Sequence, residues 1–162
     1  MMVGTLMNDI TKVDTEAVAV GFFEDLRPLK GSAGAIDWLL CGALSRLVID
    51  NRIRGALGEV ALVTNYGKIP ASKIFLVGLG PSADRSPESL RRAARSTAEQ
   101  LIRAGVQRAV VDLFPLAAEP DEGALAAARD GLRDGAGNGS LQVAMLARDS
   151  RTLAQMNRVM NG

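Results

Sequence analysis

The chain has 162 residues, 19 Lys and Arg against 18 Asp and Glu, and no histidine. Its nearly balanced charge excludes the composition of a protein that seeks polyanions, and the lack of histidine removes the usual general base and the commonest zinc ligand. The Ser-His and Cys-His catalytic pairs are excluded with it, and the single cysteine excludes an internal disulfide.

The N-terminal end of the chain carries no targeting signal that we recognise. Met1 to Asp14 lacks the basic start and long apolar run of a secretion signal, and no apolar run elsewhere reaches the ~20 residues of a membrane span. We expect residues 1–12 to be poorly ordered and residues 13–162 to form a single domain, which is a usual size for one domain. The sequence therefore predicts a cytoplasmic protein without membrane contact.

The first half of the chain contains three predicted strands and one helix. A buried strand is predicted over Ala17 to Phe23, a continuous apolar run. From Ser32 the apolar residues recur with the helical period, which predicts one helix ending near Asn51. Its apolar face comprises Ile36, Leu39, Leu40, Ala43, Leu44, Leu47 and Val48. Glu59 to Thr64 and Lys73 to Leu79 are β-rich, and their short connection predicts antiparallel neighbours.

The second half alternates helices and strands. Ser86, Pro87 and Glu88 form a helix start with an N-cap hydroxyl, and Gly105 supplies the left-handed position that commonly ends a helix. The glycine-rich segment 134–139 is predicted to be a loop. The remaining predicted elements are a strand over Val106 to Phe114, a helix over Asp121 to Arg133, a strand over Leu141 to Ala147 and a helix over Ser150 to Met160.

This order of elements predicts the fold class. Strands that alternate with helices and read as continuous apolar runs are typical of a mainly parallel sheet with helices on both faces. We therefore expect an α/β protein, a three-layer αβα sandwich with a mixed, mainly parallel sheet.

A glycine-rich turn from Leu29 to Ile36 opens the first predicted helix and is the first candidate ligand site. The free N–H groups and the dipole at a helix N-terminus attract anions, so a phosphate or carboxylate could bind there. The structural alternative is that the glycines only allow a tight turn and close packing, with Ser32 as the cap. The candidate anion-binding residues are Lys30, Gly31, Ser32, Ala33, Gly34 and, on another loop, Gly80.

The loop that holds Gly80 follows a strand but matches a dinucleotide fingerprint poorly. The helix signals begin only at Ser86, and Ala83 stands where the third glycine belongs. We therefore expect no nicotinamide, flavin or other cofactor. The loop could still line a pocket at the carboxyl end of its strand, where ligands of open α/β sheets bind.

Other charged and special residues have simpler interpretations. Arginines on the second predicted helix form a basic stripe, which we interpret as a solvated face balanced by Glu88 and Glu99, so nucleic acid is not the expected partner. Cys41 is expected to be a buried structural thiol, Trp38 a core residue and Tyr66 a loop anchor. The acidic groupings are expected to be solvated rather than metal-binding; they are Glu24, Asp25, Asp112, Glu119, Asp121 and Glu122.

Several short blocks together resemble a known family. From about Val13 to Asp112 the chain resembles the N-terminal domain of the leucyl aminopeptidases, the M17 family of metallopeptidases, in both the order and the spacing of the blocks. The blocks are Glu24 to Gly31, Gly34 to Trp38, Leu44 to Leu47, Gly58 to Val60 and Lys73 to Gly80. The resemblance implies a macro-domain-like sandwich that stands alone, because the family's C-terminal catalytic signature Asn-Thr-Asp-Ala-Glu-Gly-Arg is missing.

The resemblance implies two functions. The first is a non-catalytic protein that acts in association or regulation, with a second copy of itself or an aminopeptidase as partner, and with no catalytic or metal-binding residue. The second is a module that binds a nucleotide or other phosphate, because macro domains bind ADP-ribose on a glycine-rich turn similar to Gly31 to Ile36. The first predicted strand departs from that pattern, since Gly21 to Glu24 replaces an asparagine-containing stretch.

Overall fold

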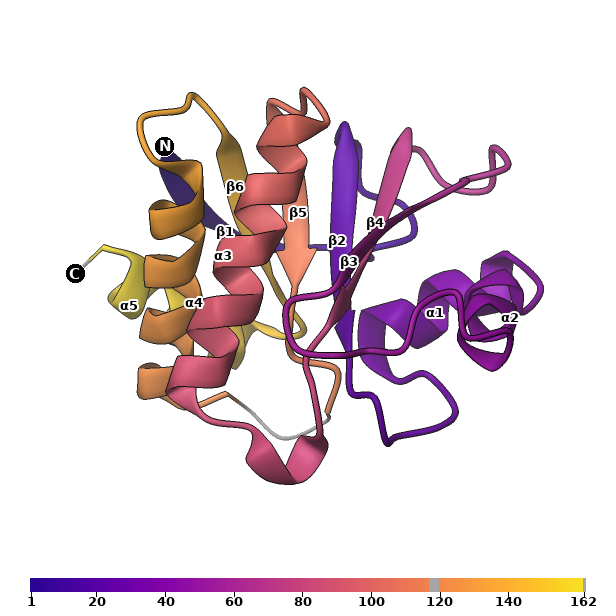
Figure 1. Ribbon diagram of the computed structural model, residues 1–162. Coiled ribbons are helices and arrows are strands. Elements are labelled where there is room, and N and C mark those ends of the chain that lie inside the picture. The colour runs from indigo at the N-terminus through magenta and orange to yellow at the C-terminus, as the bar shows by residue number, and fades with distance from the viewer. Residues whose placement is uncertain (117–119, 162) are drawn as a thin grey trace.

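Strands and helices alternate along most of the chain, which builds one mixed sheet with helices on both faces (Figure 1). The computed structural model describes residues 1–116 and 120–161. In chain order the elements are β1 (Met2–Met7), β2 (Ala17–Phe22), α1 (Gly31–Leu39), α2 (Ala43–Ile49), β3 (Val60–Val63), β4 (Lys73–Gly78), the short 3-10 helix η1 (Ser82–Asp84), α3 (Pro87–Arg103), β5 (Arg108–Asp112), α4 (Glu122–Ala136), β6 (Gln142–Ala147) and α5 (Ser150–Met160).

The sheet has the strand order β1-β6-β5-β2-β4-β3. Neighbouring strands are parallel except β3 and β4, which are antiparallel as their short connection predicts. β2 lies between β5 and β4, and all of its residues are buried, which explains why its sequence is a continuous apolar run. The predicted mixed, mainly parallel three-layer sandwich is confirmed.

The first residues of the chain differ from expectation. Residues 1–12, expected to be poorly ordered, begin with β1, which pairs in parallel with β6 from Met2 opposite Gln142 to Met7 opposite Ala147. Val3 packs into the core, and Ile10 is buried in the segment that follows. The main-chain pairing with β6 orders this edge strand, which a search for apolar runs does not detect because glycine and threonine interrupt the pattern.

The helix predicted from Ser32 to Asn51 is two helices, and that prediction is wrong in this respect. α1 and α2 are separated at Leu40 to Gly42 and meet at 109°. Cys41 and Gly42 have φ of 54° and 84°, so neither continues a right-handed helix. The Asp37 carboxylate accepts hydrogen bonds from the main-chain N–H groups of Leu44 and Ser45 and thereby caps α2.

α3 and α4 lie side by side on the opposite face of the sheet (Figure 1). The Ser86 hydroxyl accepts from the Ser89 N–H at 3.1 Å and Ser89 Oγ accepts from the Ser86 N–H at 2.9 Å, so the predicted helix start is confirmed as a capping box. A Cβ added at Gly131 or Gly135 would clash with a carbonyl oxygen of α3. α4 therefore continues through residues 134–136, which were expected to be loop, because glycine allows the helices this close approach.

Two apolar clusters fill the space on either side of the sheet. One joins α3, α4 and α5 to the sheet, and the other joins α1, α2 and the segments around Ile10 and Ile69 to its other face. No single helix among residues 1–116 and 120–161 is long and apolar enough to cross a membrane; α1 and α2 pass that test only as a bent pair.

Candidate functional site

The loops that follow β2, β4, β5 and β6 meet at the carboxyl edge of the sheet, because these strands are mutually parallel (Figure 1). Ligands of open α/β sheets bind at this edge. The glycine-rich turn before α1 lies here, together with the loop that holds Gly80, the end of β5 and the connection from β6 to α5.

The glycine-rich turn is tightly packed against the loop after β5. Gly31 has φ of +60°, and a Cβ added to it would lie 2.9 Å from the Pro115 Cα. A Cβ added to Gly34 would clash with the Leu29 carbonyl oxygen. The cavity beside the turn measures only about 10 Å³, which is space for about one water molecule. In this arrangement the glycines serve close packing, and anion binding at the turn stays a prediction.

The other residues predicted for the turn are engaged differently. Lys30 is the exposed N-cap of α1 and makes no side-chain cap, and Ala33 is buried. Ser32 does not cap the helix either, which corrects the structural alternative considered for it. Its hydroxyl donates to Asp112 Oδ2 at 2.5 Å, so the side chain ties α1 to the end of β5.

Asp112 is the buried carboxyl group of this edge, with 4% of its surface exposed. Its Oδ1 accepts from the Phe114 N–H at 3.0 Å. Burial raises the pKa of Asp112 above its ordinary value, and the hydrogen bond from Ser32 opposes that rise. The carboxyl group holds α1 and the loop after β5 together.

Arg148, which follows β6, contacts the loop after β5. Its guanidinium donates to the Leu116 carbonyl at 2.8 Å and also to the Phe114 carbonyl. The same guanidinium approaches Gly31, where Nη2 would lie 3.1 Å from an added Cβ. The loops after β2, β5 and β6 are therefore held in contact where an anion was expected.

Gly80 packs elsewhere on the carboxyl edge. Its N–H donates to the Gly55 carbonyl at 2.9 Å, and its carbonyl accepts from the Glu24 N–H at 3.1 Å. With φ of +76° it allows a conformation that other residues rarely adopt. These bonds place Gly80 in a structural turn against Leu57.

The acidic residues do not assemble into a metal centre among the described residues. No group of three or more His, Cys, Asp or Glu side chains in 1–116 and 120–161 could hold a metal ion. Asp25 accepts from the N–H and hydroxyl of Ser82, and these bonds lower its pKa. Asp121 caps α4 through the Ala124 N–H, and Glu119 lies outside the described residues.

The basic stripe on α3 is partly paired. Arg95 contacts Glu99 at 2.9 Å, which confirms one of the two expected balancing carboxylates. Arg91 contacts Asp134 of α4 at 2.7 Å. Both pairs are exposed, so each contributes little to stability.

Apolar side chains of α1 and α2 project into solvent, which the sequence did not lead us to expect. Trp38 is 85% exposed, Ile49 75% and Leu39 38%, and we call these three residues the α1–α2 apolar surface. Trp38 was predicted to be in the core and Cys41 to be a buried thiol, and both predictions are wrong. Trp38 follows the fully buried Ile36 by two positions, or about 200° around the helix, which places it on the opposite face.

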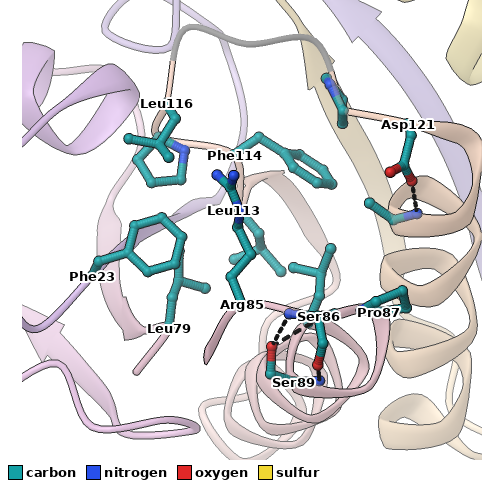
Figure 2. A pocket seen from close by; sticks show the side chains of 14 residues that line it. Phe23, Leu79, Arg85, Ser86, Pro87, Ser89, Leu113, Phe114, Leu116 and Asp121 are labelled. Atoms are coloured by element: carbon teal, nitrogen blue, oxygen red, sulfur yellow. Dashed lines mark hydrogen bonds between the residues drawn. The ribbon is translucent and has the colours of Figure 1, made fainter. Parts of the chain in front are cut away.

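An open cavity of about 250 Å³ lies on the other side of the loop after β5, between the N-termini of α3 and α4 (Figure 2). Leu79 lines it, so the prediction that the loop after β4 borders a pocket is confirmed. Arg85 and Asp121 also line it, and sequence reasoning missed them as neighbours. The sequence holds one indication of it. Arg85 and Asp121 each lie just before a helix that follows a strand of the parallel sheet, and such helix starts lie at the same edge of the sheet.

Comparison with known proteins gives one consistent result. The model of the cytosol aminopeptidase family, N-terminal domain, matches residues 19–136. A probable cytosol aminopeptidase of Geobacter sulfurreducens is 39% identical over 110 residues, which cover 67% of this chain and 22% of that protein. The chain spans about a fifth of the length of the curated relatives it matches.

Solved structures share the fold. A mutant of tomato leucine aminopeptidase aligns with a TM-score of 0.72 at 16% identity, over 98% of this chain and 35% of that one. The macrodomain of Trypanosoma brucei in complex with ADP aligns at 0.78 and 16% identity over 98% of this chain and 68% of its own. The same macrodomain in complex with ADP-ribose aligns at 0.75 and 16% identity over 96% and 68%. At these identities the likeness concerns the fold alone.

Proposed function

The chain belongs to the cytosol aminopeptidase family through that family's N-terminal domain, and on this premise we propose that it acts by protein association rather than by catalysis. The matched domain is not the catalytic domain of the family. We commit to a second copy of this chain as the partner to test first, and an aminopeptidase of the family is the other outcome.

The α1–α2 apolar surface carries this proposal. Trp38, Ile49 and Leu39 are large apolar side chains exposed on two consecutive helices, and grouped exposed apolar side chains are typical of protein-protein contacts, where tryptophan is enriched. The formal net charge of +1 supports a second copy as the partner, because it leaves little long-range repulsion between identical chains.

The test uses the fluorescence of Trp38, which is the only tryptophan in the chain. If two copies bury this side chain, dilution moves its emission to longer wavelength at the concentration where light scattering shows the mass falling to that of one chain. Trp38 stays exposed in the monomer, so emission reports association directly.

Variants locate the contact. Ile49→Ser is expected to weaken self-association by about tenfold, because we expect the exposed Ile49 to be one of the minority of interface residues whose loss costs more than about 1 kcal/mol. Leu62→Ser is the matched control: Leu62 is 58% exposed but lies on β3, away from α1 and α2. A monomer at all concentrations, both alone and with an aminopeptidase of the family, would contradict the proposal, as would equal effects of the two variants.

A nucleotide or phosphate ligand at Gly31 to Gly34 is the second candidate function. It is favoured by the shared fold of the macrodomain solved with ADP and ADP-ribose, and by the position of the turn at a helix N-terminus. The contact between Gly31 and Pro115 opposes it, because the loop after β5 would have to move.

Calorimetric titration with ADP-ribose, ADP and inorganic phosphate tests this candidate. Binding at the turn predicts heat that falls in Lys30→Ala and stays unchanged in Lys68→Ala, whose exposed side chain lies in the β3–β4 connection. Absence of heat and of any rise in melting temperature at millimolar ligand would exclude the site.

A further inference from the structure

The exposed face of α2 carries two opposite charges beside an apolar side chain. Ile49 and Asp50 follow Arg46 by three and four positions, so the three side chains project from the same side of the helix. All three are exposed, whereas Leu44 and Val48 on the opposite side of α2 are buried. Figure 1 shows α2 at the periphery of the molecule. Charged groups therefore border the part of the α1–α2 apolar surface that Ile49 forms.

The two charged side chains have no partner within the described chain. Neither the Arg46 guanidinium nor the Asp50 carboxylate makes a hydrogen bond or ion pair among residues 1–116 and 120–161. Asp50 is also the C-cap of α2, where the helix dipole favours a cation over a carboxylate. The position of Asp50 is thus unfavourable within its own helix, and a cation from another molecule would stabilise it.

The order of these residues along α2 makes this face complementary to itself. We consider two copies whose α2 helices pack antiparallel about a two-fold axis at the level of residue 48. Arg46 of each copy then lies opposite Asp50 of the second copy, and the two Ile49 side chains lie next to each other. In a parallel arrangement Arg46 would face Arg46 and Asp50 would face Asp50, and both contacts would repel. The charges therefore favour the antiparallel arrangement.

We propose that two copies of this chain associate through an antiparallel contact between their α2 helices, with Ile49 at the centre and an Arg46–Asp50 ion pair on each side of the two-fold axis. The inference rests on the proposed self-association and adds the side chains that select the partner and its orientation. Ion pairs at an interface contribute more to the choice of partner than to affinity. The two pairs make this face select a second copy over other apolar surfaces.

α3 offers a matched control for the charges. Glu88 and Arg92 are also opposite charges four positions apart on an exposed helix face, and their side chains have no partner among the described residues. The large exposed apolar side chain of α3 in the described chain is Ile102, about three turns beyond Arg92. Reversing the two α3 charges changes the net charge as the α2 reversals do, but leaves the proposed contact intact.

The first test measures the dissociation constant of the dimer by sedimentation equilibrium, with a reducing agent present because the Cys41 thiol is exposed. Arg46→Asp alone or Asp50→Arg alone turns both attractions into repulsions, and each is expected to weaken self-association by about tenfold or more. The chain with both substitutions restores opposite charges across the axis and is expected to associate within about threefold of the unsubstituted chain. Arg92→Glu and Glu88→Arg are each expected to change the constant by less than about threefold.

A mixture of the two single α2 variants is the sharper test. Arg46→Asp has two carboxylates on this face and Asp50→Arg has two guanidinium groups, so the mixed dimer is attractive at both contacts while each variant repels itself. Labelling one variant with ¹⁵N lets native mass spectrometry separate the mixed dimer from the two pure dimers. The mixed dimer is expected to be the main species at a concentration where neither variant alone is dimeric. Arg92→Glu mixed with Glu88→Arg is expected to give a mixed dimer close to its statistical share.

Two results would overturn the antiparallel contact while self-association itself stands. In the first, the unsubstituted chain is dimeric but the α2 reversals weaken it no more than the α3 reversals do. In the second, the mixed dimer of the α2 variants does not exceed its statistical share. A chain that is monomeric at all concentrations would overturn both this contact and the proposed association, so the two failures are distinguishable. Circular dichroism of each variant checks that weaker association does not arise from unfolding.

Discussion

The helical layers on the two faces of the sheet, one containing α3 and α4 and the other α1 and α2, differ in how many of their apolar side chains are buried. On the α3–α4 side, glycines let the two helices touch, and Ala93, Ala94, Ala98 and Leu101 are buried in the core. On the α1–α2 side, Ile36 and Leu44 are buried while Trp38 and Ile49 face solvent. These apolar side chains of α3 are buried within the chain itself, whereas α1 and α2 bury some of their apolar side chains and expose others.

This difference shows what an apolar pattern in a sequence can and cannot predict about burial. A helical period shows which residues share a face, but it does not say whether that face meets the sheet of the same chain or another molecule. The α1–α2 segment has apolar residues on more than one face, and only the break at Cys41 and Gly42 decides which of them reach the core.

The largest expected effect is at the contact between α3 and α4. Gly131→Val should destabilise the fold by more than about 4 kcal/mol, because the new side chain meets the Arg91 carbonyl and the Ala94 methyl group and neither can move aside. Urea denaturation followed by circular dichroism measures the free energy of unfolding. Gly123→Ala is the control in the same helix: its Cβ meets only the Asp121 side chain at 3.3 Å, so stability should stay equal or rise slightly.

The second prediction compares apolar residues within the α1–α2 layer. Leu44→Ala should cost about 3 kcal/mol, since Leu44 is fully buried and its truncation leaves a cavity. Trp38→Ala removes a larger side chain and should change the stability of the monomer by less than about 0.5 kcal/mol. Denaturation must be measured at a concentration where the chain is monomeric. A loss of 2 kcal/mol or more in Trp38→Ala would mean that Trp38 belongs to the core after all.

The sequence predicts the elements of the α3–α4 layer and of the central sheet well. Ser86, Pro87 and Gly105 mark both ends of α3, and the antiparallel β3–β4 pair follows from a connection too short for a crossover. Helix caps and short connections depend only on residues that are near one another in sequence, so they can be predicted without knowing the tertiary structure. β1 was missed because its order depends on pairing with β6, which lies more than a hundred residues away in sequence.

The candidate sites were less predictable, because they depend on contacts between loops. The glycines of the Gly31 turn are visible in the sequence, but their contact with Pro115 is not. The pairing of Ser32 with Asp112, and the meeting of Arg85 and Asp121 around one cavity, both require knowing which strands are neighbours. The order β5-β2-β4 in the sheet brings these loops together, and no spacing rule specifies that order.

The third prediction concerns the junction between α1 and the end of β5. Ser32→Ala should cost about 2 kcal/mol, because it removes the hydroxyl donor and leaves a buried carboxyl oxygen without it. Ser96→Ala is the control: this hydroxyl is half-buried on α3 beside Gly58. Thermal unfolding at pH 7 measures both, and a loss in Ser32→Ala no larger than in the control would contradict a joining role for the Ser32–Asp112 pair.

The pH dependence of the same junction has a defined sign. Burial raises the pKa of Asp112 in the folded chain above the ordinary 3.8, so the folded state holds this proton more tightly than the unfolded state. The tighter binding of this proton stabilises the folded state fully below pH 3.8. This contribution of Asp112 to the free energy of unfolding is lost as pH rises through the raised pKa. The stability of Asp112→Asn relative to the unsubstituted chain should therefore increase as pH rises from 4 to 7. A difference that does not change with pH would show that Asp112 is not perturbed.

The smallest effect distinguishes the starts of the two helices that open the layers. Ser86→Ala should cost about 1 kcal/mol, because the hydroxyl accepts from the Ser89 N–H and the reciprocal bond closes the first turn of α3. Lys30→Ala at the N-cap of α1 should change stability by less than about 0.3 kcal/mol, since Lys30 makes no side-chain cap and the turn is held by Gly31 against Pro115 and by Ser32 on Asp112. Chemical denaturation resolves the two. Equal losses of stability in the two variants would mean that α1, like α3, depends on the side chain of its own N-cap residue. A smaller loss in Lys30→Ala is expected if contacts with the end of β5 and the loop after it fix the start of α1.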